Sequence, residues 1–295
     1  MKKAHGNFKL FGKYAWYVPG VADLFILLLF LLVGALLGNG VSLLFVGLMG
    51  QAGMEYATLI SYPLMFIPPM LYAAAKSRKN ALVAGGLALN SSHFAPLGGV
   101  LCALLVALAT LSGALMSDAV NALLPPMPEW LETILKNMTT GRFWVNFLCV
   151  SIFAPFFEEW LCRGMVLRGL LGRGMKPVWA IVVSALFFAL IHMNPWQAIP
   201  AFLLGCLFGY VYFKTGSLLL TMLMHFVNNT AALVVGHIDS LKDYDNWIDL
   251  LGAKPYAFAF AGCALLIVLI VLQLRRIPLQ KPSGACDEVP ALFTE

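Results

Sequence analysis

Long apolar runs separated by short polar stretches make up most of this chain of 295 residues. A run of about 20 apolar residues crosses the roughly 30 Å hydrocarbon core of a bilayer as an α-helix. Eight runs are candidates, the fifth and sixth being the shortest: 20–38, 56–75, 96–117, 143–172, 177–192, 197–213, 217–236 and 255–274. Since a helix satisfies its own backbone hydrogen bonds in lipid, the pattern predicts an all-α, polytopic membrane protein with about eight transmembrane helices.

Composition agrees with a membrane protein. Hydrophobic residues make up 61% of the chain and charged residues 11%, whereas a soluble globular domain carries about 25% charged residues. The mean hydropathy is +0.85. We therefore exclude a soluble globular protein and expect the lipid bilayer to be the solvent of the folded chain.

The basic residues indicate the orientation. An even number of spans places both termini on one side, and positively charged loops mark the cytoplasmic side. With cytoplasmic termini, 15 of the 19 basic residues lie inside, including Arg163 and Arg168, and the four outside are Lys136, Arg142, Lys242 and Lys254. This orientation accounts for the net charge of +5 and requires no nucleic-acid partner. Without a eukaryotic sorting signal, the chain is predicted to lie in a prokaryotic inner (cytoplasmic) membrane.

Three parts are expected along the chain. Residues 1–142 hold the first three spans and their loops, including a short interfacial helix near Trp130–Leu135. Residues 143–236 hold spans four to seven and the candidate chemistry, because the first three spans carry almost no ionisable residues. Residues 237–295 form an external loop, the last span and a cytoplasmic tail, disordered after Lys281. The six cysteines contain no C-x-x-C pair and are interpreted as small packing residues.

Two adjacent carboxylates lie within the fourth predicted span. A charged side chain at the centre of a membrane helix costs about 2.5–3.5 kcal/mol, so such residues usually have a use. Glu158 and Glu159 point about 100° apart on a helix. Glu159 precedes Arg163 by four residues, the favourable order for an ion pair, which gives Glu159 a structural role. Glu158 is left as a candidate general base.

His192 is expected at the depth of Glu158. Glu158 lies 16 residues before Gly174, at the turn between spans, and His192 lies 16 residues after Lys176. In an antiparallel hairpin both arrive about 24 Å above that turn. Phe188 shares the face of His192 and is expected to form a wall of the site.

The seventh span contributes the second histidine. Asn229 follows His225 by one turn and shares its face, whereas Asn228, the competing choice, points about 100° away. We expect Glu158, His192, His225 and Asn229 to meet in one buried polar pocket. The alternative reading is that these side chains are hydrogen-bond partners between helices.

Three segments resemble a known family. Phe157–Gly164 (FEEWLCRG), Phe188–His192 (FALIH) and His225–Asn229 (HFVNN) resemble the motifs of the CAAX-protease and bacteriocin-processing (CPBP, or Abi) intramembrane proteases, which include the type II CAAX prenyl endopeptidases. The similarity covers about residues 150–235. It implies an eight-span protease with a cavity in the bilayer, where Glu158 activates water with His192 assisting. His225 and Asn229 would stabilise the oxyanion.

The resemblance leaves the cofactor open between two mechanisms. In one, a divalent metal such as Zn²⁺ is bound by Glu158, His192 and His225, a sufficient ligand set for a catalytic site. In the other, the glutamate acts without a metal. The chain lacks the H-E-x-x-H motif, and both mechanisms stay open.

The predicted function is an intramembrane endopeptidase that cleaves a membrane polypeptide, such as a prenylated tail or a leader peptide. The alternative is a non-proteolytic protein of transporter or bacteriocin-immunity type, which uses the buried Glu and His residues as a proton relay or ligand site. No inverted repeat of the transporter kind is visible in the sequence, which speaks against the alternative.

Overall fold

The computed structural model describes residues 9–50, 52–81, 86–140, 142–241, 244 and 246–279. All regular structure in these ranges is helical. The six longest α-helices are α1 (Val21–Met49), α2 (Ala52–Asn80), α3 (Gly99–Asn121), α9 (Pro195–Thr215), α10 (Leu218–Gly236) and α12 (Ala253–Arg275). Shorter elements are η1 (Lys9–Tyr14), α4 (Glu129–Thr140), α8 (Pro177–Leu190) and α11 (Trp247–Leu251).

A further long helix runs from residue 143 to residue 172 and is called helix 143–172 below. It consists of five joined segments, α5 (Phe143–Asn146), η2 (Phe147–Phe153), α6 (Ala154–Glu159), η3 (Trp160–Leu167) and α7 (Arg168–Gly172). Of these, η2 and η3 are π-helical. It is the fourth of the predicted spans and carries both buried glutamates.

The prediction of an all-α polytopic membrane protein is confirmed. Among the described residues, seven helices are long and apolar enough to cross a bilayer. Each of the eight predicted apolar runs forms a helix, but the fifth, α8, has 14 residues and is about 21 Å long. It pairs with α9 as a hairpin, in which Pro177 begins α8.

The boundaries predicted for the first two spans are too short. α1 and α2 have 29 residues each, and α1 continues past Gly38 and Gly40. Glycine weakens an isolated helix, but here it permits close packing. A Cβ on Gly34 would lie 2.1 Å from the carbonyl oxygen of Met65, and one on Gly38 would lie 2.8 Å from that of Ser61. Small residues four apart allow two membrane helices to approach closely, so α1 and α2 pack tightly at these two glycines.

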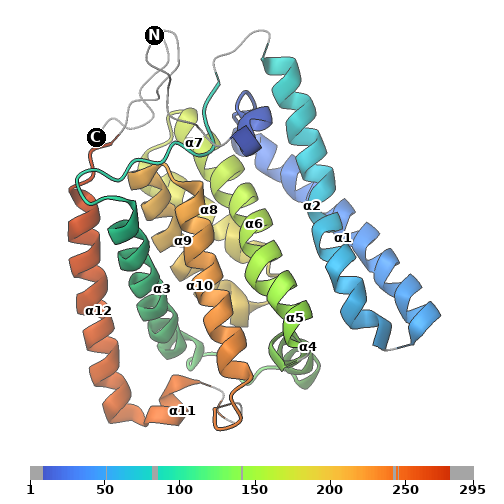
Figure 1. The fold of residues 1–295 in the computed structure, drawn as a ribbon, viewed down its shortest axis with the longest axis vertical. Coiled ribbons are helices and arrows are strands. Elements are labelled where there is room, and N and C mark those ends of the chain that lie inside the picture. Colours follow the sequence, from blue (N-terminus) through green and yellow to red (C-terminus); the bar gives the residue numbers. More distant parts are fainter. Residues whose placement is uncertain are drawn as a thin grey trace.

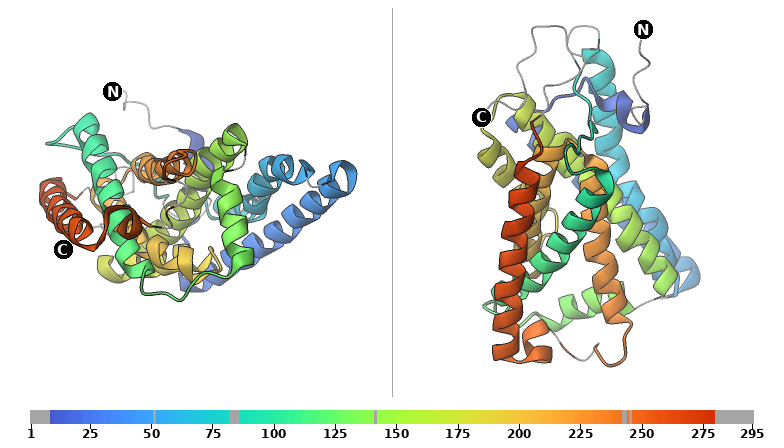
Figure 2. Two further views of the ribbon diagram at one scale, coloured as in Figure 1. Left: turned by 90° about the horizontal axis from the view of Figure 1, so that it is seen from below. Right: turned by 60° about the vertical axis from the view of Figure 1, so that its left-hand side comes forward.

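Helix 143–172 occupies the middle of the bundle. Figures 1 and 2 show the α1–α2 hairpin at one flank and α12 at the other, with helix 143–172 between them. It contacts α2 on one side and α8 and α10 on the other, while α3 packs against α9, α10 and α12. The helix that carries Glu158 and Glu159 therefore lies between α2 on one side and α8 and α10 on the other.

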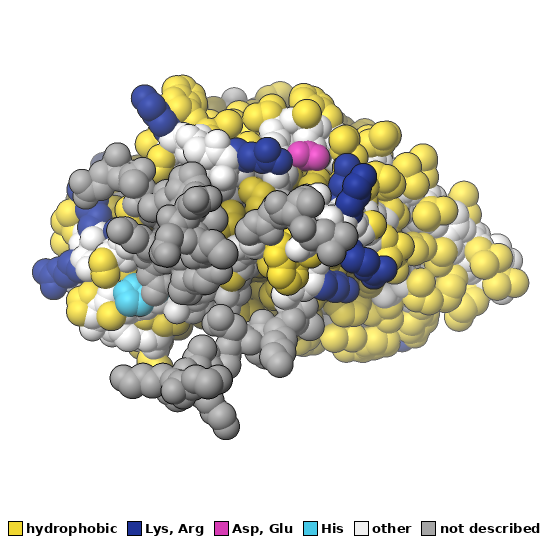
Figure 3. All heavy atoms as spheres, turned by 90° about the horizontal axis from the view of Figure 1, so that it is seen from above, with side chains coloured by type: hydrophobic (Ala, Val, Ile, Leu, Met, Phe, Trp, Pro, Cys, Tyr) yellow, Lys and Arg dark blue, Asp and Glu magenta, His cyan; other side chains and the backbone are white. Residues whose placement is uncertain are grey.

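The two ends of the molecule differ in charge. The turn between α1 and α2, α4 and α11 lie at one end, whereas η1, the α7–α8 turn and the end of α12 lie at the other (Figure 1). Figure 3 shows Lys and Arg side chains around this second end, with few acidic ones. The first and last described helices, η1 and α12, therefore both reach this end of the molecule. That this side is the cytoplasm stays a prediction.

Arg163 and Arg168, counted among the basic residues of the cytoplasmic side, are buried, at 0% and 2% exposed. Arg168 donates to the backbone carbonyls of Leu87 and Gly164, so it ties the segment before α3 to this helix.

Smaller predictions have separate outcomes. The short helix expected in 118–142 is present as α4, which extends to Thr140. Cys102, Cys149, Cys162, Cys206 and Cys263 are free thiols, as expected. Cys286 and the tail after Lys281 lie outside the described residues, and the division of the chain into three parts stays a prediction.

Candidate functional site

The local backbone of helix 143–172 is irregular around the glutamates. Glu158 and Glu159 lie in α6, a six-residue α-helical segment between the two π-helical segments. Pro155 lies near its start and has no N–H to donate to the preceding turn. π-Helical segments are rare and frequently occur at functional sites, because their i→i+5 bonding redirects the side chains that follow.

The predicted ion pair between Glu159 and Arg163 is present. Arg163 Nη1 lies 2.8 Å from Glu159 Oε1, and both side chains are fully buried. Arg163 Nη2 also donates to the carbonyl of Gly205 at 2.9 Å. Its guanidinium carbon lies 4.6 Å from the ring centroid of Phe188 and 5.4 Å from that of Phe208. A buried ion pair is tolerated when further contacts compensate desolvation, and here they fix Glu159 in place.

Glu159 has a second partner that the sequence did not suggest. His225 Nδ1 lies 3.1 Å from Glu159 Oε1. An ionised carboxylate only accepts hydrogen bonds, so we assign the Nδ1 hydrogen to His225 as donor. The sequence reading gave Glu159 to Arg163 alone, because i,i+4 spacing reveals partners on the same helix and not those on α10.

The other ring nitrogen of His225, Nε2, lies towards Glu158. His225 Nε2 lies 4.0 Å from Glu158 Oε2, and the two residues are 5% and 9% exposed. This separation exceeds a direct hydrogen bond but places a carboxylate oxygen and an imidazole nitrogen at one small locus inside the bundle.

The other oxygen of Glu158 is bonded to a residue that the sequence reading missed. The Tyr62 hydroxyl, on α2, donates to Glu158 Oε1. Glu158 Oε2 accepts no hydrogen bond from any described residue. The sequence did offer one signal: Tyr62 lies within a span, away from the headgroup layer, and a buried phenol usually needs a hydrogen-bond partner.

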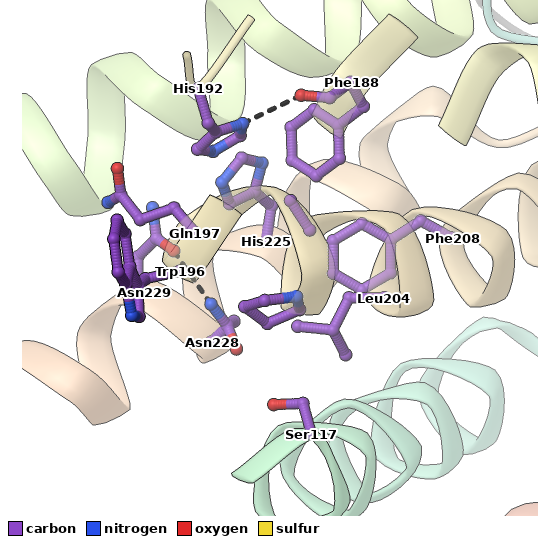
Figure 4. A pocket seen from close by; sticks show the side chains of 12 residues that line it. Ser117, Phe188, His192, Trp196, Gln197, Leu204, Phe208, His225, Asn228 and Asn229 are labelled. Atoms are coloured by element: carbon purple, nitrogen blue, oxygen red, sulfur yellow. Dashed lines mark hydrogen bonds between the residues drawn. The ribbon is translucent and has the colours of Figure 1, made fainter. Parts of the chain in front are cut away.

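His192 lies at a cavity of about 190 Å³. Figure 4 shows His192 and His225 on the same side of this cavity, beside Phe188. The Phe188 ring contacts both imidazoles edge-on, with centroids 5.0 Å from His192 and 5.5 Å from His225, which confirms Phe188 as a wall. His192 Nδ1 lies 2.8 Å from the Phe188 carbonyl and donates to it, so Nε2 of the neutral ring is an acceptor.

Asn229 faces the cavity as predicted, but Asn228 does so too. The angle of about 100° between the two side chains does not exclude Asn228 from the site, because the cavity borders a wide arc of α10. Asn229 Nδ2 donates to the Val150 carbonyl at 2.8 Å, and Asn228 Nδ2 donates to Asn229 Oδ1 at 3.0 Å. These two bonds fix the orientation of the Asn229 amide and leave its second N–H available.

The four predicted residues gather only in part. His192, His225 and Asn229 line the cavity, whereas Glu158 is not among its lining residues and approaches His225, with its Oε2 4.0 Å from His225 Nε2. Within the described part of the chain, no hydrogen bond or ion pair joins Glu158 to His192. Helical spacing predicts the position of a residue along its own helix, but it carries no information about the lateral separation of Glu158 and His192.

The predicted zinc ligands do not form a metal site as arranged here. Among the described residues, no three His, Cys, Asp or Glu side chains converge as metal ligands. Tyr62 holds one oxygen of Glu158, and Glu159 holds Nδ1 of His225. A bound metal therefore stays a prediction from the family resemblance, and no step below uses one.

Fold and site together define the class, an integral membrane protein with buried Glu158, Glu159 and His225 and half-buried His192 and Asn229 inside a helical bundle. In a comparison with known families, residues 140–231 match the family model described as type II CAAX prenyl endopeptidase Rce1-like. This match confirms the resemblance seen in the three motifs, and it contains Glu158, His192, His225 and Asn229. Tyr62 lies outside it. Neither the curated proteins nor the solved structures gave a match to the chain.

Proposed function

We propose that this protein is an intramembrane endopeptidase of CAAX-protease type, which hydrolyses a peptide bond of a membrane polypeptide. The observation that carries the proposal is the approach of Glu158 Oε2 to His225 Nε2, 4.0 Å apart, beside a cavity and within the segment that matches the endopeptidase family.

Glu158 acts as the general base. Its Oε2 takes a proton from a water molecule while the water oxygen attacks the carbonyl carbon of the scissile bond. The carbonyl π electrons move to oxygen, giving a tetrahedral oxyanion. Glu158 then returns the proton to the leaving nitrogen, the C–N bond breaks, and a carboxylic acid and an amine remain. Proton transfer by a positioned group contributes about 10²–10⁴-fold to a rate.

His192 holds the attacking water. Because Nδ1 of His192 donates to the Phe188 carbonyl, its Nε2 accepts a hydrogen bond from water at the cavity wall. The second water hydrogen then remains for Glu158. This division of the two protons orients the water oxygen towards the substrate carbonyl.

His225 and Asn229 stabilise the oxyanion. The Glu159 carboxylate beside Nδ1 stabilises the positive charge of a protonated His225, whose Nε2–H then donates to the oxyanion. The second N–H of Asn229, held by Asn228 and Val150, is the other donor. Removing one such donor from a hydrolase costs about 2.7–4 kcal/mol in the transition state.

The experiment compares Glu158→Gln with Glu129→Gln in purified protein reconstituted with a fluorogenic membrane peptide. Glu129 is an exposed acid on α4, so the same chemical change there controls for the loss of charge. We expect Glu158→Gln to lower kcat by at least about 100-fold and Glu129→Gln to leave it unchanged. Wild-type cleavage by Glu158→Gln would refute the proposal.

A further inference from the structure

We propose that Tyr62 is a positioning residue of the active site, which holds Oε1 of Glu158 so that Oε2 alone serves as the base. This inference rests on the proposed endopeptidase function and extends it to a helix outside the segment that matches the family. The Tyr62 hydroxyl donates to Glu158 Oε1, across a sequence separation of 96 residues.

A stripe of α2 residues, Thr58, Tyr62 and Phe66, docks on helix 143–172. They are spaced by four and so share one face. The Thr58 hydroxyl lies 3.7 Å from Cys149 Sγ, and the Phe66 ring stacks on Phe157 with centroids 5.2 Å apart and planes inclined by 15°. Tyr62 is thus held from the turns on both sides, and its hydroxyl position is determined by packing.

The close approach of α1 reinforces this placement. Gly34 packs against the backbone of Met65 and Gly38 against that of Ser61, the residues on either side of Tyr62 along α2. Because these contacts are with backbone atoms, α2 has little freedom to slide at the height of Tyr62.

A carboxylate without such a partner exchanges its two oxygens, because its terminal torsion is broad and roughly two-fold. The hydrogen bond from Tyr62 gives the two oxygens different surroundings. Oε1 is held by the phenol, and Oε2, free of any bond from the described residues, faces His225. The base therefore presents one fixed lone-pair direction to water, and a misplaced reacting group costs up to about 100-fold in rate.

The test measures kcat and KM of Tyr62→Phe in reconstituted protein with the fluorogenic membrane peptide. The variant removes the hydroxyl and keeps the ring packing. We expect kcat to fall by about 10- to 100-fold with KM within about two-fold of wild type, because Tyr62 acts through Glu158 and not on the bound peptide. A wild-type kcat would overturn the inference.

Two control variants separate positioning from general loss of structure. Tyr212→Phe removes another buried phenol, whose hydroxyl donates to the Leu89 carbonyl at 2.8 Å, and we expect an unchanged kcat. Phe66→Leu weakens the docking of α2 but keeps the Tyr62 hydroxyl, and we expect a smaller fall in kcat than for Tyr62→Phe. An equal or larger fall for either control would overturn the inference.

The outcome is distinguishable from failure of the proposed function. If Glu158→Gln cleaves as fast as wild type, the proposed function fails. If Glu158→Gln is inactive and Tyr62→Phe has the wild-type kcat, Glu158 keeps its role and only the inference about Tyr62 fails.

Discussion

At the scale of single residues, a chain of polar contacts joins helix 143–172 to α10. Arg163 binds Glu159, Glu159 accepts from His225, and His225 faces Glu158. The sequence predicted the first contact from i,i+4 spacing. The others join residues 66 and 67 positions apart, and helical periodicity carries no information about which helices are neighbours. The likeness of the motifs to a protease family named the residues but did not reveal their hydrogen bonds.

The asparagine pair gives a prediction at this scale. Asn229→Ala removes an oxyanion donor, and we expect kcat to fall by about 100-fold or more with little change in KM. Asn228→Ala removes only the group that orients the Asn229 amide, so the fall in kcat should be smaller. Steady-state kinetics of both variants checks this prediction. A larger fall in kcat for Asn228→Ala than for Asn229→Ala would contradict it and would make Asn228 the oxyanion donor.

At the scale of elements, the docking of α2 was beyond what the sequence offered. Hydropathy located both helices of the first hairpin, but it ended α1 at residue 38 and treated the first three spans as free of chemistry. Tyr62 contributes to the site because Gly34 and Gly38 draw α1 against α2. Glycine spacing was visible in the sequence, but its meaning depends on which helix lies opposite.

The glycine contact predicts a stability effect. In Gly34→Leu the new Cβ would lie 2.1 Å from the Met65 carbonyl oxygen, whereas a Cβ on Gly40 would meet no atom within 4 Å. Overpacking costs about 1–3 kcal/mol, and α2 must move with Tyr62. We expect Gly34→Leu to lower both Tm and kcat, and Gly40→Leu to change neither. Equal Tm values in thermal unfolding of the two variants would contradict the packing argument.

At the scale of the whole molecule, the sequence predicted the fold class and the grouping of basic residues at one end. It did not foresee that Arg163 and Arg168 are buried, since a charge count cannot distinguish an exposed arginine from one that is hydrogen-bonded in the interior. The remaining basic residues at this end still follow the positive-inside pattern, so the predicted orientation keeps its physical basis.

Orientation is testable by labelling introduced cysteines in intact cells. Cysteines are introduced by Leu123→Cys or Lys176→Cys in a Cys286→Ser background. Residue 123 follows α3 at the end expected outside, and residue 176 lies at the α7–α8 turn expected in the cytoplasm. Both positions are exposed. We expect a membrane-impermeant maleimide to label residue 123 in intact cells and residue 176 only after the membrane is opened. The reverse pattern would invert the topology.

The central claim is that Glu158 activates water to hydrolyse a peptide bond inside this bundle. It is tested most directly by incubating wild type and Glu158→Gln, each reconstituted in vesicles, with a defined membrane peptide in ¹⁸O-labelled water. Mass spectrometry of the products should show wild-type cleavage with ¹⁸O in the new carboxyl group, at a rate at least about 100-fold above that of Glu158→Gln. Equal product from both proteins, or no cleavage by wild type, would contradict the account.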